Sequence, residues 1–392
     1  MRMNIWIVNP FDNLPQEGYR PQRYWLMSRA FAQAGHDVVY WTSDFSHAHK
    51  RQRKCSNEEM GPWEGEGFRL VLVPTPGYRR NICLRRIWSH RVFAKRWRTL
   101  AELEAKKPDV VIASLPPLAS GAQALEFCRK HGAKFVADIQ DAWPETFYRV
   151  LPKFLFAPLR RVAREIYRGA DAVSGVAQRY LDLASSYGST APRRLVPLGI
   201  DQSANRPIDQ STNRTILRLL YAGNMGASYD LATVVTGVKE MEGVTLDLAG
   251  TGPKEPMLRA LAEGCDRIRF HGYLDEKGLR DFLVQGDVAL VPMFDASCVG
   301  VPGKMGDYTA AGLPVLNSLT GETESLLAEH GAGFTYKAGN VGAFRAAVDK
   351  VRSLDDEGWR LLRAGAAKLA HRFDASLIFP AYVSWVEESL KA

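Results

Sequence analysis

The chain has 392 residues, 46% of them hydrophobic, which is enough for two domains of ordinary size with substantial cores. No run of eighteen apolar residues occurs, so no membrane-spanning helix is predicted. The five scattered cysteines include no C-x-x-C pair, which argues against a disulfide framework or a zinc site and fits reduced cytosolic thiols. Residues 1–190 hold 29 Lys and Arg against 18 Asp and Glu, whereas the rest of the chain is slightly acidic. A basic N-terminal half predicts an anionic partner, such as a membrane surface, a phosphate-bearing acceptor or nucleic acid.

The first elements have the order typical of a parallel sheet. Residues 4–8 predict a buried strand, a polar loop and a helix to about Ala34 follow, and residues 37–42 predict a second strand. Ligands of such sheets bind over the carboxyl ends of the strands. We therefore expect the loop that ends at Gly18 to contact acceptor or donor; the alternative is a solvated turn. Further strands are predicted at 68–73, 108–113, 134–139, 170–173 and 194–196, and helices at 119–131 and 178–187.

The segment 44–54 is polar and basic. Its histidines, His47 and His49, are two residues apart, a spacing that suits a strand edge and not one face of a helix. No carboxylate or cysteine accompanies them, so we expect a flexible loop on the acceptor side and no metal.

Residues 79–98 combine cations with tryptophan at helical spacing. Leu84 and Trp88 are four residues apart, as are Phe93 and Trp97, and eight Lys or Arg surround them without one acidic residue. A basic amphipathic helix with tryptophan can lie on an anionic membrane, and we expect this contact. The alternative is a helix that packs its apolar side on the sheet. We expect no nucleic-acid partner, because no recognised nucleic-acid module occurs.

Carboxylates gather after the predicted strand 134–139, in the sequence D-I-Q-D-A-W-P-E. Asp138, Asp141 and Glu145 would lie at the carboxyl end of that strand, where active-site groups of α/β sheets are found. Asp141 could bind a sugar or acceptor hydroxyl; alternatively it caps the following turn. No further ligands support a metal at the two aspartates. The next segment, 147–168, is aromatic and basic and could extend a membrane-facing surface or pack in the core.

A polar segment at residues 202–214 predicts a surface linker, after which a second series of strands and helices begins. Glycine-containing loops follow three of its strands: G-N-M-G from Gly223, G-T-G-P from Gly250, and Gly272-Tyr273. G-x-G-P is a weak signal on its own, and its position between a strand and a helix makes it more informative. The strands are expected at 218–222, 245–249, 269–271 and 287–292, and the helices at 279–285, 343–354, 357–373 and 376–391.

The most informative stretch is C-V-G-V-P-G-K-M-G-D-Y-T-A-A-G-L-P-V, residues 298–315. It predicts a Gly-rich turn, a short helix that ends at Gly312, and a buried strand. Free amides at a first helical turn hold anions, and Lys304 adds a full charge there, so a phosphate or diphosphate is the natural ligand. Asp307, one turn further on, could accept hydrogen bonds from a ribose diol. The alternative is an ordinary connection with a surface Lys and Asp.

The stretch V-P-G-K-M-G-D-Y-T-A-A-G-L-P-V resembles the nucleotide-sugar site of retaining GT-B glycosyltransferases of the GT4 type. It is most similar to a subset associated with bacterial surface-polysaccharide assembly. The resemblance covers nearly the whole chain, including D-A-W-P at 141–144 and P-L-G-I-D at 197–201. It implies a GT-B fold, with two Rossmann-like, doubly wound parallel-sheet domains facing a cleft. The acceptor domain would be residues 1–200 with the final helix 376–392, and the nucleotide-sugar domain residues 215–373.

The resemblance also implies roles for single residues. Asp307 matches the acidic residue that holds the ribose, whereas Val299 stands in place of a sugar-contacting glutamate. Asp141 would act at the reacting sugar or acceptor, and Lys304 would stabilise the departing diphosphate. Further donor contacts are expected from Gly223, Asn224, Gly226, Gly250, Gly252, Gly272, Tyr273, Gly300, Val301, Gly303 and Glu324, and acceptor-side contacts from Gly18 and Trp143.

Together these features imply transfer of a sugar from a nucleotide-diphosphate sugar to a lipid-linked or surface-glycan acceptor, with retention and without metal or cofactor. The enzyme would be cytoplasmic, at the inner face of the cell membrane. Two alternatives stay open: a nucleotide-sugar epimerase of GT-B fold, and a non-catalytic glycan- or nucleotide-binding component of an assembly complex, which the residue at Val299 favours. Release of free nucleotide from a donor would support a transferase, interconversion an epimerase, and no reaction a binding component.

Overall fold

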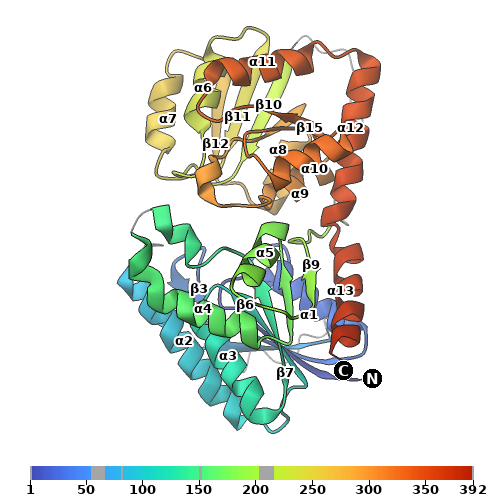
Figure 1. Ribbon diagram of the computed structural model, residues 1–392. Helices are drawn as coiled ribbons and strands as arrows, with labels where there is room; N and C mark the ends of the chain where they lie inside the picture. Colours follow the sequence, from blue (N-terminus) through green and yellow to red (C-terminus); the bar gives the residue numbers. More distant parts are fainter. Residues whose placement is uncertain (1, 54–66, 81–82, 150–151, 203–215, 391–392) are drawn as a thin grey trace. The chain divides into compact units, whose positions relative to one another are not determined.

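The computed structural model describes residues 2–53, 67–80, 83–149, 152–202 and 216–390. The chain forms two compact units (Figure 1). We call Met1–Gly199 with Ala375–Ala392 the first domain, and Ile200–Asp374 the second domain. Each is a parallel β-sheet with a hydrophobic core on both faces. The predicted α/β fold class, with two doubly wound parallel sheets, is confirmed.

The first domain contains a seven-stranded sheet in the order β5-β2-β1-β6-β7-β8-β9. Its strands are β1 (Asn4–Val8), β2 (Asp37–Ser43), β5 (Arg69–Val73), β6 (Val110–Leu115), β7 (Lys134–Ile139), β8 (Ala172–Gly175) and β9 (Arg193–Leu195). Its helices are α1 (Arg23–Gln33), α2 (Leu84–Leu103), α3 (Leu118–His131), α4 (Ala157–Gly169), α5 (Gln178–Ser186) and α13 (Ala375–Ser389). Helix α4 was not among the predicted elements.

Strand β1 shows why the core strands are continuous apolar runs. Alternate side chains of a strand point to opposite faces. Trp6 and Val8 enter the core that contains residues of α2 to α5, whereas Ile5 and Ile7 enter the core formed with α1 and α13. Because helices cover both faces, both sets of side chains must be apolar.

The second domain contains a six-stranded sheet in the order β12-β11-β10-β13-β14-β15. Its strands are β10 (Leu217–Ala222), β11 (Val244–Ala249), β12 (Ile268–Gly272), β13 (Val288–Val291), β14 (Val315–Asn317) and β15 (Gly333–Thr335). Its helices are α6 (Leu231–Lys239), α7 (Glu255–Ala262), α8 (Glu276–Leu283), α9 (Lys304–Ala310), α10 (Glu322–His330), α11 (Val341–Arg352) and α12 (Asp356–Ala370).

The sequence predicted a loop at residues 44–54 and a linker at residues 202–214. Instead of a loop, residues 44–53 contain a short antiparallel pair of strands, β3 (Phe45–Ser46) and β4 (Arg51–Gln52). The predicted linker at 202–214 lies outside the described residues, apart from Gln202, whose side-chain amide donates to the carbonyl of Ala370.

Helix α2 corrects the expectation that its two tryptophans lie on one membrane-facing surface. Trp97 is 0% exposed and packs with Phe93 in the core of the first domain, whereas Trp88 is 53% exposed. Phe93 and Trp97 are one helical turn apart, so they share the inner face of the helix. The first turns of α2 expose Leu84, Ile87 and Trp88 to solvent, and its last residue, Leu103, is exposed as well.

Candidate functional site

Three glycine loops meet at the carboxyl end of the second sheet. They follow β10, β11 and β12, which are neighbours in the sheet, so their ends lie together. The Gly223 N–H donates to Ala249 O (3.0 Å), and the Gly250 N–H donates to Gly272 O (2.6 Å). A Cβ atom on Gly250 would overlap the carbonyl group of Gly223, and Gly250 has a φ of +115°. Only glycine fits there, so the loops leave bare backbone at this edge.

A second close approach joins the first loop to the second. The Met225 N–H donates to Thr251 O (2.9 Å). A Cβ atom on Gly252 would lie 2.5 Å from Asn224 Oδ1 and 2.6 Å from the Met225 backbone. The expected donor residues of these two loops therefore lie in one compact group, and the structure also brings Gly272 to it.

Helix α9 is held against this group by Tyr308. The Tyr308 hydroxyl accepts a hydrogen bond from Ala222 N (2.8 Å) and donates to Ala222 O (3.2 Å), at the last residue of β10. The loop before α9 is tied to α10, because the Thr323 hydroxyl donates to Gly300 O (2.7 Å). These contacts fix where the side chain of Lys304, the first residue of α9, can point.

The Lys304 ammonium is buried beside the first glycine loop. Its Nζ lies 3.9 Å from the ring centroid of Tyr221 and 4.3 Å from that of Tyr229. A Cβ atom on Gly223 would be 2.7 Å from the same nitrogen. Within the described part of the chain, Nζ has no hydrogen-bond partner. Lys304 is therefore not a surface lysine, and its ammonium lies over the faces of two tyrosine rings, which attract a cation.

Burial lowers the pKa of Lys304 well below its usual value, and the charge of Asp307 counteracts this only in part. An isolated buried ammonium is costly because it loses its hydration without a compensating partner. A bound anion would supply that partner. The site can thus bind a phosphate group between a cation and glycine backbone.

The other expected donor residues occupy more varied positions. Asp307 is half-buried one turn after Lys304 on α9. Val301 packs partly against the core, and Gly303 is exposed. Tyr273 is 66% exposed, and Glu324 is an exposed residue in the first turn of α10.

Sequence reasoning missed Lys254. Its backbone N–H donates to Met225 O (2.9 Å), which places the start of α7 on the first glycine loop. Its Nζ lies 5.8 Å from the ring centroid of Phe294. The available signal was its position directly after G-T-G-P.

In the first domain, the environment of Asp141 fits both expected roles, binding of a sugar or acceptor hydroxyl and capping of the following turn. Its carboxylate accepts from the Ala142 N–H (2.8 Å) and the Thr146 hydroxyl (3.1 Å), as a turn-capping residue would. Burial raises its pKa. Trp143, two residues later, packs edge to face on Phe147 and lies under the guanidinium of Arg86.

Asp138, in contrast, is a structural residue, which corrects its expected place among active-site groups. It is completely buried and bonded by both Arg23 Nε and Nη2 (3.0 and 2.9 Å), Tyr24 and Ser174. Although burial opposes this, the charge and hydrogen bonds of Arg23 hold the pKa of Asp138 below its usual value. Its oxygens are already engaged, so Asp138 is not available with Asp141 for a metal. The residues that the structure describes contain no group of three or more His, Cys, Asp or Glu placed to hold one.

Gly18 ends a short 3₁₀ helix with a φ of +80°. Its N–H donates to Pro15 O (3.0 Å), so this amide is engaged within the turn. This geometry favours the interpretation of Gly18 as a turn residue.

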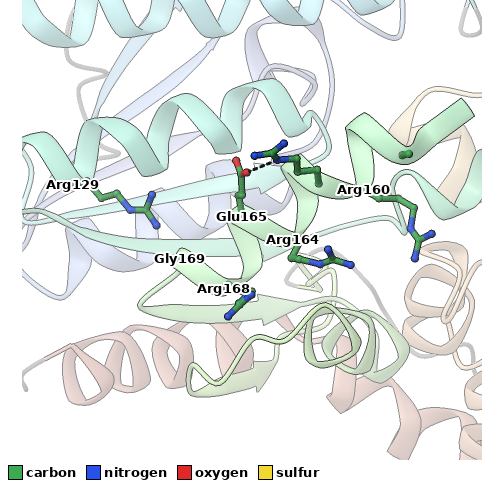
Figure 2. A pocket seen from close by; sticks show the side chains of 8 residues that line it. Arg129, Arg160, Arg164, Glu165, Arg168 and Gly169 are labelled. Atoms are coloured by element: carbon green, nitrogen blue, oxygen red, sulfur yellow. Dashed lines mark hydrogen bonds and ion pairs between the residues drawn. The ribbon is translucent and has the colours of Figure 1, made fainter. Parts of the chain in front are cut away.

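A basic groove of about 630 Å³ lies elsewhere on the first domain, along α3 and α4 (Figure 2). Five arginines line it: Arg129, Arg160, Arg161, Arg164 and Arg168. Its acidic residue, Glu165, is paired with Arg161 at 3.2 Å. The groove is therefore strongly positive.

The two parallel-sheet α/β domains define the class of the protein, which has the GT-B fold. Residues 23–204 match the family model described as Glycosyltransferase Family 4, and residues 216–353 match Glycosyl transferases group 1. The chain is thus a glycosyltransferase, with one family domain in each half.

Solved structures of the same fold cover almost the whole chain. Sucrose-phosphate synthase from Thermosynechococcus elongatus is 14% identical, with a TM-score of 0.77 and 99% of each chain covered. Anabaena HepE in complex with UDP-glucose is 11% identical, with a TM-score of 0.67 and 99% of this chain and 100% of that chain covered. The lipopolysaccharide outer core galactosyltransferase WaaB is 14% identical, with a TM-score of 0.65 and coverage of 98% and 99%. No curated protein matches the sequence.

Proposed function

We propose that this glycosyltransferase takes its sugar from a nucleotide-diphosphate sugar bound to the second domain. The observation that carries the proposal is the buried Lys304 ammonium, which has no hydrogen-bond partner within the described residues and lies beside Gly223. A diphosphate matches this site in charge, and the glycine loops leave room for it to approach the backbone. HepE, which shares the fold, was solved with UDP-glucose.

In this proposal, charge stabilisation is the main catalytic contribution of the second domain. The departing diphosphate gains negative charge as the glycosidic bond breaks, and Lys304 stabilises that charge from a desolvated position. Lys254 follows the second glycine loop, and its backbone N–H donates to Met225 O of the first; in this proposal its ammonium is a second cation for the diphosphate. Asp307 accepts hydrogen bonds from the ribose, and no metal or cofactor is needed to neutralise the diphosphate.

The first domain would bind the acceptor, with Asp141 holding a sugar or acceptor hydroxyl. Transfer with retention, membership of the retaining GT4 type and a lipid-linked or surface-glycan acceptor are proposed on the resemblance of residues 298–315. Proton NMR of the product made from an α-linked donor tests retention, because a β-linked product would contradict it.

We also propose that the enzyme works as a peripheral protein on the inner face of an anionic cell membrane. The first turns of α2 expose Leu84 (83%) and Trp88 beside the cations Arg85 and Arg91. Exposed apolar side chains with flanking cations bind anionic interfaces. No helix that the structure describes is long and apolar enough to cross a membrane.

One experiment tests the donor site directly. The protein is screened with nucleoside diphosphates by thermal unfolding, because a ligand bound only by the folded state raises the melting temperature. Donor sugars are then incubated with the protein and release of free nucleotide is measured. Stabilisation by a nucleoside diphosphate with slow nucleotide release supports the proposal; interconversion of the donor sugar without nucleotide release would instead indicate an epimerase.

A further inference from the structure

The basic groove along α3 and α4 is lined by cations from successive turns of one helix. Arg160, Arg164 and Arg168 are four residues apart, so they follow one side of α4 (Figure 2). Neighbours in this row are separated by about 6 Å along the helix axis, and the row extends over about 12 Å. Arg129 of α3 adds a charge at the end of α4, where a Cβ atom on Gly169 would lie 2.5 Å from its Nη2 atom. The groove therefore presents its positive charges in a row.

Acidic groups balance few of these charges. Among the described residues, no ion pair involves Arg129, Arg164 or Arg168. Arg161 pairs with Glu165, but both side chains are exposed (82% and 62%), and such pairs contribute little. The groove can therefore accept a ligand that carries several negative charges.

The stability of α4 does not account for its row of arginines. Cations four residues apart on a helix repel each other, and Arg160, Arg164 and Arg168 form two such pairs. The dipole of α4 favours Arg168, which lies in the last turn. The Tyr187 hydroxyl and, more weakly, Glu145 raise the pKa of Arg160, so its charge is balanced in part. Solubility alone is served by a face that mixes both signs of charge, whereas here five arginines accompany one glutamate.

The groove begins close to the acceptor-side residues of the first domain. Phe156, directly before α4, stacks on Phe147 with ring centroids 5.8 Å apart, and Phe147 packs on Trp143 at 4.6 Å. Helix α4 connects the carboxyl end of β7 to the start of the parallel strand β8. Its arginines therefore lead from that end of the sheet toward the opposite edge. A chain whose end reaches Trp143 can continue along the row.

We propose that this groove binds a linear acidic stretch of the acceptor glycan, in which successive sugars carry carboxylates. This inference rests on the proposed function, and it names the class of acceptor. A guanidinium can bond both oxygens of a carboxylate at once, and carboxylate is the anionic group that a sugar ring itself carries. A chain of acidic sugars can engage several arginines together, and linked contacts reinforce one another.

The lining of the groove favours a glycan over an anionic membrane. Besides its charged residues, the lining contains Ala157 and Gly169, so it offers no large apolar side chain that could enter a bilayer. The exposed apolar residues Phe154 and Leu155 precede α4 and do not line the groove. A hydrated polyanion fits such a surface better than lipid does.

The test measures binding of hexagalacturonate by the full chain, with maltohexaose as the uncharged chain of equal length. The main variant is Arg164→Glu with Arg168→Glu, which reverses two charges at exposed positions. Arg91→Glu with Lys95→Glu is the matched control, because these cations are also exposed and four residues apart, on α2 of the same domain. We expect the groove variant to weaken hexagalacturonate binding about tenfold or more, and the control to bind it as the wild type does.

Two further measurements test the same site. Arg164→Gln with Arg168→Gln removes the two charges without reversing them, and it should weaken hexagalacturonate binding in the same direction but less. Monomeric galacturonate should bind the wild type at least about tenfold more weakly than the hexamer, because it can engage only part of the row.

Equal binding of hexagalacturonate by the groove variant and the wild type would overturn the inference, as would equally tight binding of maltohexaose. Binding of inorganic polyphosphate without binding of hexagalacturonate would overturn it in favour of a phosphate-bearing partner. Loss of binding to phosphatidylglycerol vesicles in the groove variant, with hexagalacturonate binding unchanged, would overturn it in favour of a membrane.

Nucleoside diphosphate binding, measured alongside, separates this inference from the proposed function. It should be the same in the groove variant and the wild type, because the donor site belongs to the second domain. If no nucleotide binds but hexagalacturonate binds in a way that depends on Arg164 and Arg168, the proposed donor function fails while the groove assignment stands.

Discussion

The replacement Lys304→Met tests the donor site while leaving its packing largely in place. Methionine keeps an unbranched apolar stem between Tyr221 and Tyr229 and removes only the ammonium. That ammonium is buried without a hydrogen-bond partner in the described chain. Replacing buried charges by apolar side chains is often neutral or stabilising by about 1–4 kcal/mol, so the ligand-free variant should unfold at the same or a higher temperature than the wild type.

Ligand binding should change in the opposite direction. One charge-assisted hydrogen bond contributes about 1.5–3 kcal/mol, so the variant should bind a nucleoside diphosphate roughly 10- to 100-fold more weakly. At a concentration of about 100 times the wild-type Kd, the ligand stabilises the wild type by about 2.7 kcal/mol but the variant by only about 0.4–1.4 kcal/mol. Turnover should fall by about 10²–10³, the typical effect of removing one group that stabilises developing charge.

Thermal unfolding with and without nucleotide, together with nucleotide release from the donor, measures both effects. Lys350→Met is the matched control, because Lys350 lies 4.1 Å from the ring of Phe334 in the same domain but is an exposed residue of α11. The control should keep wild-type activity. An undiminished nucleotide-dependent rise in melting temperature for Lys304→Met would refute the assignment of Lys304 to the diphosphate.

Three further predictions follow from the same structure. Burial lowers the pKa of Lys304 in the free protein, and a bound diphosphate would raise it. At a pH between these two pKa values, nucleotide binding should therefore be accompanied by the uptake of up to about one proton. Calorimetric heats of binding that are the same in buffers of different ionisation enthalpy would contradict this. Gly250→Ala should lose nucleotide binding and destabilise the protein by more than about 1 kcal/mol, whereas Gly264→Ala, with a φ of +76° and no atom within 4 Å of its Cβ position, should lose only the smaller backbone-strain energy and keep binding. Trp97→Ala should lower the unfolding free energy by about 3–5 kcal/mol, because Trp97 is buried. Trp88→Ala should leave the stability unchanged and weaken binding to anionic vesicles, because Trp88 is exposed. Equal vesicle binding by Trp88→Ala and the wild type would contradict this prediction.

The sequence predicted the sheet well where the signal is local. Strands β1 and β7 have the predicted bounds, because a strand buried on both faces is a continuous apolar run that ends at polar or glycine residues. Helix α4 was not predicted, because its many arginines mask the apolar side of a helix that packs residues such as Ile166 into the core.

The candidate site was predictable only in part. The glycine loops could be found because each follows a strand, and neighbouring parallel strands end at the same edge of the sheet. The location of the Lys304 side chain could not be predicted, because it depends on contacts with two tyrosines that precede it by more than seventy residues in the sequence. Lys254 was overlooked for the same reason: its contact with Met225 is tertiary.

By itself, then, the sequence determined the two sheets, the glycine loops and the basic character of the first half, because these depend on short-range patterns and on composition. Only the tertiary structure decided the environment of individual charged and aromatic side chains. Asp138 and Asp141 are three residues apart, yet the first is held in the core by Arg23, 115 residues away, and the second is half-buried. Burial is set by contacts between distant parts of the chain, and burial decides whether a charge stabilises the fold or is available to a ligand.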